Sequence, residues 1–329
     1  MGMIVKIRWE KCFVEQFPIQ VKINSIDTDM QAILLAAGHG TRLRPYTNIR
    51  PKPLFPVCNR PLLPRLLAQL RACDCSPILV NCHHLAEQIQ TALAAWPELL
   101  IQVEPEILGT GGSLRQALNR LDNDPVLVVN GDLYHDIDLE QVYHRHLRSK
   151  NDVTLALHDY PRFNNVGVEG DRVRNFGARE GARLAFTGIQ VVDPEVIELI
   201  PATGFHHIID LYQELAVQDR VGSCRVDGAL WRDIGTPADY LQLHGELLAG
   251  NQDSGGWLVD PAARVGAGVV LEGWGCIGPG AVIGNGARLC RTVVWDGAEV
   301  AANSTWVDAI VTGNPDIDQA ARQSGAPCS

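Results

Sequence analysis

The chain has 329 residues and a formal charge of −10, and at roughly 150 residues per domain it has room for about two domains. Hydrophobic residues make up 46% of it and charged residues 20%, which excludes a wholly disordered chain. No apolar run approaches the roughly 20 residues of a membrane helix, and the N-terminus lacks the pattern of a signal peptide. The 28 basic residues form no block. Neither a membrane nor a nucleic acid is therefore an expected partner.

The cysteines indicate a reducing compartment. Nine are present, an odd number without the spacing of a disulfide framework, so we expect a cytoplasmic protein. One group comprises Cys73, Cys75, Cys82, His83 and His84. Its spacing fits no zinc pattern, and an apolar run precedes Cys82, so packing at a strand end is the favoured interpretation.

Residues 1–29 form an N-terminal extension of unknown role. Their hydrophobic residues alternate weakly, which is compatible with one or two added strands. Alternatively, Met30 is the true start, because a strong strand pattern follows it directly.

Between residues 30 and 250, short apolar runs alternate with stretches of helical pattern. The expected strands are Ala32–Leu35, Pro77–Val80, Leu99–Val103, Val126–Val129, Val153–Ala156, Phe186–Val192 and Cys224–Ile234. The expected helices are Leu62–Ala72, Leu85–Ala95, Ser113–Leu121 and Pro237–Leu248. This alternation predicts an α/β fold with a doubly wound, mostly parallel sheet, in which ligands bind at the carboxyl ends of the strands.

Residues 257–312 follow a polar, glycine-rich linker and carry a repeat of six residues. Aliphatic side chains recur at Val265, Leu271, Ile277, Ile283 and Leu289, and the step resumes one residue out of phase at Val294, Val300 and Trp306. A hexapeptide repeat predicts a short parallel β-helix whose aliphatic residues point inward. Residues 313–329 are expected to form a tail.

A glycine-rich turn follows the first expected strand. We call it the phosphate loop, and it comprises Leu35, Ala36, Ala37, Gly38, His39, Gly40 and Thr41. Such a turn exposes consecutive backbone N–H groups, which bind phosphate oxygens. A dinucleotide turn would need a third glycine where Leu43 stands, and the lysine of a P-loop is absent.

Five ordered stretches together resemble the sugar-1-phosphate nucleotidyltransferases. They are the phosphate loop with Arg50–Leu54, then Leu108–Gly112, Val129–Asp132, Phe186–Ile189 and Trp231–Pro237. The resemblance implies a Rossmann-like nucleotidyltransferase domain over residues 30–250, and a left-handed β-helix for the repeat. It also implies an enzyme that transfers a nucleotidyl group from a nucleoside triphosphate to a sugar 1-phosphate, giving an NDP-sugar and pyrophosphate.

The resemblance implies catalytic roles for four charged residues. Asp132 and Asp233 match the family's metal aspartates, and two carboxylates suit Mg²⁺, the implied cofactor. Arg42 and Lys52 would neutralise the triphosphate and the charge that develops on pyrophosphate. Further residues match binding positions of the family. For the nucleotide these are the phosphate loop with Gly109, Thr110, Gly111, Gly112 and Gly131, and for the sugar they are Gly167, Thr187 and Gly188.

One departure leaves the substrates open. The family's Glu-Lys-Pro, whose lysine holds the sugar phosphate, is missing from residues 174–183, where Arg179 or Arg183 could substitute. The repeat and the Gly109–Gly112 loop are similar to the mannose-1-phosphate guanylyltransferase branch, which uses GTP. The missing lysine is similar to the N-acetylmuramate 1-phosphate uridylyltransferase branch, which uses UTP. A non-catalytic homologue that senses a nucleotide sugar is a third alternative. The open ends of a short β-helix predict a homo-oligomer.

Overall fold

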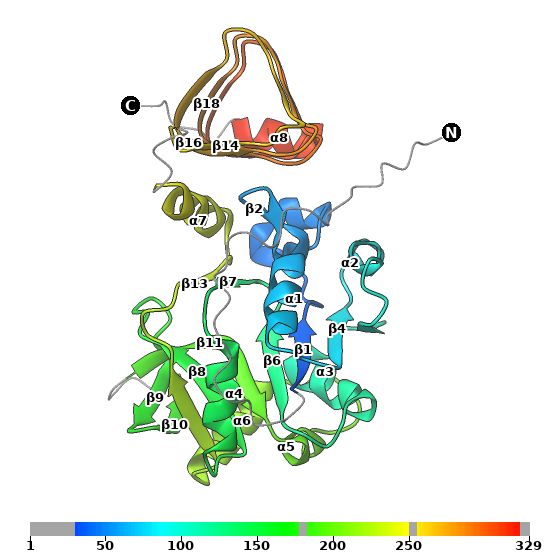
Figure 1. The fold of residues 1–329 in the computed structure, drawn as a ribbon, viewed down its shortest axis with the longest axis vertical. Helices are drawn as coiled ribbons and strands as arrows, with labels where there is room; N and C mark the ends of the chain where they lie inside the picture. The colour runs from blue at the N-terminus through cyan, green and yellow to red at the C-terminus, as the bar shows by residue number, and fades with distance from the viewer. Residues whose placement is uncertain (1–29, 178–182, 250–254, 323–329) are drawn as a thin grey trace.

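A nine-stranded sheet forms the centre of the larger part of the molecule (Figure 1). The structure is a computed structural model and describes residues 30–177, 183–249 and 255–322. The strands of this sheet are β1 Gln31–Leu35, β4 Ile78–Cys82, β5 Leu100–Val103, β6 Val126–Asn130, β8 Val153–His158, β9 Val166–Glu169, β10 Arg172–Phe176, β11 Arg183–Val192 and β12 Val221–Arg225. Their order across the sheet is β5-β4-β1-β6-β11-β8-β12-β10-β9.

The sheet is mixed, so the expectation of a mostly parallel sheet is wrong for its second half. In the first half, β1 pairs in parallel with β4 and β6, and β4 with β5. In the second half, β11 runs antiparallel to β6, β8 and β9, and only β8 and β12 are parallel. The connections explain the difference. A parallel pair needs a long crossover, whereas only Gly170 and Asp171 separate β9 from β10.

The hexapeptide segment forms a coil of stacked parallel strands, which we call the coil (residues 257–311) (Figure 1). One sheet holds β14 Trp257–Val259, β16 Val270–Ile277, β18 Arg288–Val294 and β20 Thr305–Val311, and a second holds β15 Arg264–Val265, β17 Val282–Ile283 and β19 Glu299–Val300. Arg264 is opposite Val282, and Val282 is opposite Glu299, so successive turns are 18 and 17 residues long. The shorter turn explains the change of phase before Val294.

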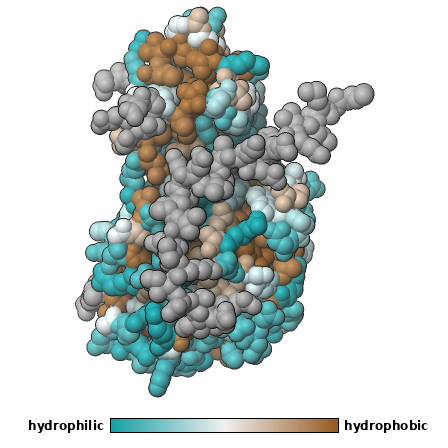
Figure 2. All heavy atoms as spheres, viewed as in Figure 1, coloured by the Kyte–Doolittle hydropathy of each residue, from teal (hydrophilic) through white to brown (hydrophobic). Residues whose placement is uncertain are grey.

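The expected inward side chains of the coil are buried, except in its first turn. Ile277, Ile283 and Leu289 are at most 1% exposed. Val265 is 45% exposed, because strand β15 is covered by another turn on one side only. Figure 2 shows that hydrophobic residues gather on the coil, whereas the larger part presents mainly hydrophilic residues in that view.

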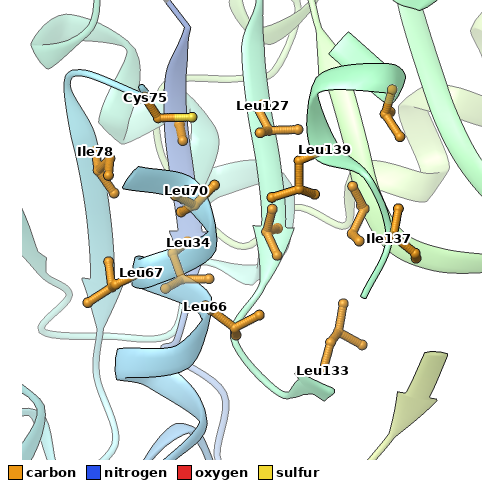
Figure 3. Packing of buried hydrophobic residues seen from close by; sticks show 14 of the residues in the cluster. Leu34, Leu66, Leu67, Leu70, Cys75, Ile78, Leu127, Leu133, Ile137 and Leu139 are labelled. Atoms are coloured by element: carbon orange, nitrogen blue, oxygen red, sulfur yellow. The ribbon is translucent and has the colours of Figure 1, made fainter. Parts of the chain in front are cut away.

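Helices cover both faces of the large sheet. They are α1 Leu62–Ala72, α2 Ala86–Leu93, α3 Gly109–Ala117, α4 Leu139–Leu147, α5 Pro194–Glu198 and α6 Ile208–Val217. Neighbouring side chains of a strand point to opposite faces. Leu34 of β1 therefore packs in one hydrophobic cluster with α1, α2 and α4, where Figure 3 shows it beside Leu66 and Leu70. Ile33 packs in the other cluster with α3, α5 and α6. The doubly wound arrangement is confirmed.

Two expected elements differ from the structure. Helix α3 begins at Gly109 rather than Ser113, because the glycines of residues 109–112 fold into its first turn. The expected strand Cys224–Ile234 is two strands in different sheets, β12 and β13 Trp231–Asp233. Between them Gly228 adopts a φ of 92°, which interrupts an extended chain. Helix α1 is confirmed with the expected bounds, and so is α7 Pro237–Leu248.

Three small features complete the fold. Strands β2 Pro56–Val57 and β3 Arg60–Pro61 form a hairpin, and β7 Leu133–His135 pairs with β13 in a separate ribbon. Short 3₁₀ helices are η1 Thr41–Leu43, η2 Tyr46–Asn48, η3 Lys52–Leu54 and η4 Leu118–Arg120. The expected tail contains helix α8 Pro315–Arg322, which packs against β20.

The expectation for residues 1–29 falls outside the described residues. Within the described residues, no helix has the length and apolarity to cross a bilayer.

The coil packs against the segment that carries η2, η3 and the β2–β3 hairpin. The ring of Trp295 is 1% exposed and lies 4.9 Å from that of Phe55, centre to centre. Its Nε1 donates to the Tyr240 hydroxyl at 3.2 Å, and that hydroxyl donates to the Pro56 carbonyl. Arg50 lies over the Trp295 ring at 4.5 Å and forms two hydrogen bonds to Asp296, of 2.6 and 3.0 Å. The two parts therefore share one hydrophobic core.

Candidate functional site

Four charged side chains that lie far apart in the sequence meet at one place. Lys52 Nζ lies 2.6 Å from Asp132 Oδ2 and 3.1 Å from Asp233 Oδ1. Arg42 Nη2 lies 3.5 Å from Asp233 Oδ2. Arg42 belongs to η1, Lys52 to η3 and Asp233 to β13, and Asp132 stands in the turn between β6 and β7. The four residues predicted to act together are thus brought together by the fold.

The β7–β13 ribbon explains why the two aspartates are neighbours. In this antiparallel pair Asp233 lies opposite Leu133, the residue that follows Asp132. A carboxylate at the end of a buried strand needs a charged or hydrogen-bonding partner, and here Lys52 serves both. Because the two carboxylates offer hard oxygen ligands side by side, this donor set fits Mg²⁺.

Lys52 is held rigidly. It stands between Pro51 and Pro53, whose rings fix the backbone φ on both sides. Its side chain is 7% exposed, whereas that of Arg42 is 62% exposed. Lys52 is therefore enclosed between the carboxylates, whereas most of the Arg42 side chain is accessible to a ligand.

The phosphate loop leads from the end of β1 toward these residues. The Ala36 N–H donates to Asn81 Oδ1 at 2.7 Å, and the Gly131 N–H donates to the Leu35 carbonyl at 2.7 Å. Gly40 adopts a φ of 59°, and a Cβ there would lie 2.8 Å from the Thr47 methyl group. Gly38 has open space around its Cα. Hydrogen bonds thus hold the first residues of the loop, and its backbone changes direction at Gly40.

Three histidines surround the exposed side of this loop. The ring of His39 lies 5.4 Å from the rings of both His83 and His84, centre to centre. Burial, and then the charges of these two rings, lower the pKa of His39. His83 Nδ1 lies 2.8 Å from the Glu104 carbonyl, and His84 Nε2 lies 2.6 Å from that of Thr47. His83 and His84 therefore support the loops around the site.

The Gly109–Gly112 segment packs closely against residues 204–208. A Cβ on Gly109 would lie 2.5 Å from the His206 carbonyl, to which the Gly111 N–H donates at 2.8 Å. The Thr110 hydroxyl accepts from the Ile208 N–H at 3.2 Å. The glycines are thus needed for close packing, and their contact with a nucleotide base stays a prediction.

A pocket opens beside the charged residues on the predicted sugar side. It is lined by Arg42, Asp132, Asp233, Asn130, Leu133, Phe163, Asn165, Phe176, Phe186, Thr187, Gly188, Ile209 and Trp231. Gly188 has a φ of 80°, and a Cβ there would lie 2.6 Å from the Asn130 amide nitrogen. The Thr187 hydroxyl donates to the Ala156 carbonyl at 2.8 Å, so it faces the sheet. Gly167 is not part of the lining and packs against Asn175.

Sequence reasoning missed two groups of residues at the site. The first is the aromatic wall of Phe163, Phe176 and Trp231, to which flat apolar faces of a sugar ring can pack. The second is a buried polar network beneath the loops. Asn81 Nδ2 donates to Glu104 Oε1 at 2.8 Å and to Ser113 Oγ at 3.0 Å. Polar residues inside or directly after apolar strands were the available signal for this network.

The cysteine and histidine residues near position 80 serve packing. Cys73, Cys75 and Cys82 are free thiols, and Cys75 and Cys82 are buried. Burial raises the pKa of the Cys73 thiol to about 12 and that of Cys82 to about 11. These thiols stay protonated at neutral pH, as the packing interpretation requires.

Comparison with known proteins identifies related sequences over most of the chain. Residues 31–250 match the family model described as nucleotidyl transferase. A mannose-1-phosphate guanylyltransferase of Mycobacterium tuberculosis is 32% identical, over 83% of this chain and 82% of its own length. A UTP–glucose-1-phosphate uridylyltransferase of Synechocystis is 27% identical, over 88% and 89%. The structure of HddC from Yersinia pseudotuberculosis with GMP-PN has a TM-score of 0.56 at 22% identity, over 66% of this chain and 99% of that one.

Proposed function

Since this chain belongs to the nucleotidyl transferase family and transfers a nucleotidyl group to a sugar 1-phosphate, we propose that its substrates are GTP and mannose 1-phosphate. The relatives from Mycobacterium tuberculosis, Pichia angusta and Drosophila melanogaster are all described as mannose-1-phosphate guanylyltransferases. The contact of Lys52 with two aspartates that line one pocket together with Arg42 carries the chemical part of the proposal.

The reaction mainly requires the protein to position the two substrates and to neutralise the charge of their phosphates. An oxygen of the sugar phosphate attacks the α-phosphorus of the triphosphate, and the bond from that phosphorus to the β-phosphate oxygen breaks. Pyrophosphate leaves in line with the attack. Lys52 lies between the two aspartates, and there its charge would stabilise the negative charge of the triphosphate and of the leaving pyrophosphate. Arg42 is exposed enough to contact the leaving pyrophosphate.

Mg²⁺ is the proposed cofactor, held by Asp132 and Asp233. When bound, it neutralises phosphate charge and aligns the α-phosphate. Lys52 contacts one oxygen of each aspartate, so the second oxygen of Asp132 is a candidate ligand, as is that of Asp233 if Arg42 moves from it. The phosphate loop, Leu35 to Thr41, supplies backbone N–H groups for the β- and γ-phosphates.

Arg183 is our candidate for the sugar phosphate, in place of the lysine that the chain lacks. It stands opposite Gly167 in the β9–β11 pair, and Gly167 lies two residues after Asn165 of the pocket lining. Its Nε and Nη2 are buried and have no hydrogen-bond partner within the described residues. Guanidinium groups bind phosphate through two parallel hydrogen bonds, so Arg183 can take over the task. The other candidate, Arg179, lies outside the described residues.

We also propose that the coil is a left-handed β-helix and that it joins copies of this chain into a homo-oligomer. Turns of 17 and 18 residues equal about three hexapeptides, as expected for a triangular coil. The first-turn residues Val259 and Val265 are 39% and 45% exposed. Strands β14 and β15 each have a neighbour on one side only, and such edges favour association. The cytoplasmic location that we expect from the cysteines stays a prediction.

A grid of substrates tests the proposed function. Pyrophosphate release is measured with Mg²⁺ for GTP, UTP, dTTP, ATP and CTP against mannose, glucose, N-acetylglucosamine and N-acetylmuramate 1-phosphates. We expect GTP with mannose 1-phosphate to give the highest kcat/KM. A preference for UTP with N-acetylmuramate 1-phosphate would establish the alternative substrate pair. If no pair reacts while a nucleotide sugar binds, the chain is a non-catalytic sensor.

A further inference from the structure

Two thiols and one imidazole lie together where the coil meets the larger part of the molecule. Cys58 stands at the tip of the β2–β3 hairpin, His244 on α7 and Cys276 on β16. One ligand atom from each of the three lies within 4.8 Å of those of the other two. Tetrahedral zinc sites hold their sulfur and nitrogen ligands about 2.0–2.3 Å from the ion, so two such ligands lie no more than about 4.6 Å apart, and small side-chain shifts bring these three atoms within that range.

Other contacts hold these three side chains in place. Asn59, next to Cys58, donates from Nδ2 to the carbonyl of Ile277, next to Cys276, at 2.9 Å. His244 Nδ1 lies 2.8 Å from the Tyr240 carbonyl, which can only accept, so Nδ1 carries the proton. The lone pair of His244 Nε2 therefore points toward Cys58, whose N–H lies 3.1 Å away. A carbonyl that fixes the tautomer of a histidine is the usual support of a metal ligand.

Burial and charge favour the same kind of ligand. His244 and Cys276 are both 0% exposed, so an isolated charge there would be costly. Two thiolates and one divalent cation would leave the cluster without net charge.

We propose that Cys58, His244 and Cys276 bind a thiophilic metal ion, and that Zn²⁺ is the ion this ligand set fits. Cys58 is only partly buried, so water can complete the four ligands from its side. The ion would replace the hydrogen bond between His244 Nε2 and the Cys58 N–H. It would connect the hairpin, α7 and the coil.

Metal titration of the full-length protein tests the proposal. The protein is purified with a reductant, treated with a chelator and titrated with Zn²⁺ against a chromophoric competitor, in excess Mg²⁺ to occupy the aspartates. Co²⁺ serves as a spectroscopic probe, because thiolate ligands give an intense near-ultraviolet band that carboxylates do not. The test variant is Cys58→Ala. The matched control is Cys73→Ala, which also removes a partly buried free thiol.

We expect one equivalent of Zn²⁺, a thiolate band with Co²⁺, and a thermal midpoint that Zn²⁺ raises in the wild type and in Cys73→Ala. Cys58→Ala should lose the band and bind Zn²⁺ at least about 100-fold more weakly. Mutation of a residue that only supports a ligand already lowers metal affinity by up to about 100-fold, and removal of the ligand itself should lower it at least as much. Equal affinity in the two variants would overturn the proposal. So would a reduced wild-type protein that binds no Zn²⁺ in excess Mg²⁺, or one that binds Co²⁺ without the thiolate band.

Discussion

Replacing Lys52 by methionine separates the electrostatics of the site from its shape, because methionine keeps most of the volume and loses the charge. Lys52 Nζ lies 2.6 Å from one oxygen of Asp132 and 3.1 Å from one of Asp233. The sum of these distances places the two oxygens no more than 5.7 Å apart. Without Lys52, the two carboxylates face each other with no buried counter-charge between them.

The repulsion between the carboxylates is the same in both proteins, so the cost is the loss of their attraction to Lys52. A hydrogen bond to a charged group contributes about 1.5–3 kcal/mol net. The side chains of Asp132 and Asp233 are 36% and 18% exposed, so solvent screens both contacts. We therefore expect Lys52→Met to lose about 2 kcal/mol of unfolding free energy in the presence of a chelator.

Magnesium should reverse most of this loss. A cation between the aspartates replaces the missing charge, so Mg²⁺ should stabilise Lys52→Met more than it stabilises the wild type. Turnover should nevertheless fall by roughly 100-fold or more, because the charge of the triphosphate and of the leaving pyrophosphate is no longer stabilised by Lys52. Urea unfolding with chelator and with Mg²⁺ measures the first effect, and pyrophosphate release the second. Lys150→Met, at an exposed lysine, is the control. Equal Mg²⁺ stabilisation of Lys52→Met and the wild type would refute the reasoning.

Three further substitutions test other parts of the site and fold. Asp132→Asn should reduce turnover by roughly 100-fold or more with an unchanged circular dichroism spectrum; near-normal turnover would contradict its metal role. Arg183→Ala should raise KM for the sugar phosphate by roughly 10- to 100-fold while KM for the triphosphate stays constant, and Arg183→Lys should recover part of the loss. Burial, with the charge of Arg65, lowers the pKa of His135 from 6.5 to about 3. The folded state thus resists a proton that the unfolded state accepts, and stability falls as pH drops below 6.5, by about 2 kcal/mol at pH 5. In urea unfolding at pH 6.5 and at pH 5, the free energy of unfolding of His135→Gln should fall less between the two pH values than that of the wild type. An identical pH dependence of the two proteins would refute the assignment to His135.

The meeting of the four charged residues was predicted from the motifs that resemble a known family, and a local pattern supports it for Asp132. Asp132 follows a buried apolar strand, and the carboxyl ends of neighbouring parallel strands lie at one edge of a sheet. The pairing of β7 with β13 could not be predicted, because strands of three residues carry no periodic signal. The antiparallel β11 was missed for a related reason, since apolar runs do not reveal their direction.

Features that depend on contact between the two parts of the chain were also beyond sequence analysis. Trp295 belongs to the hexapeptide segment, where an aromatic residue could equally face solvent or a second copy of the chain. Its contact with Phe55 could be predicted only if the orientation of the coil were known. The same is true of Cys58 and Cys276, which are far apart in sequence and meet only at this junction.

The junction at Trp295 also limits how far this protein is modular. The Arg50 side chain, two residues before Lys52, is held by Asp296 and the Trp295 ring, so the segment that carries Lys52 is attached to the coil. A chimera that joins residues 30–249 to the coil of a relative would have to preserve this pair to keep full activity. Variation in the coil can therefore alter catalysis without any change among the residues that touch the substrates.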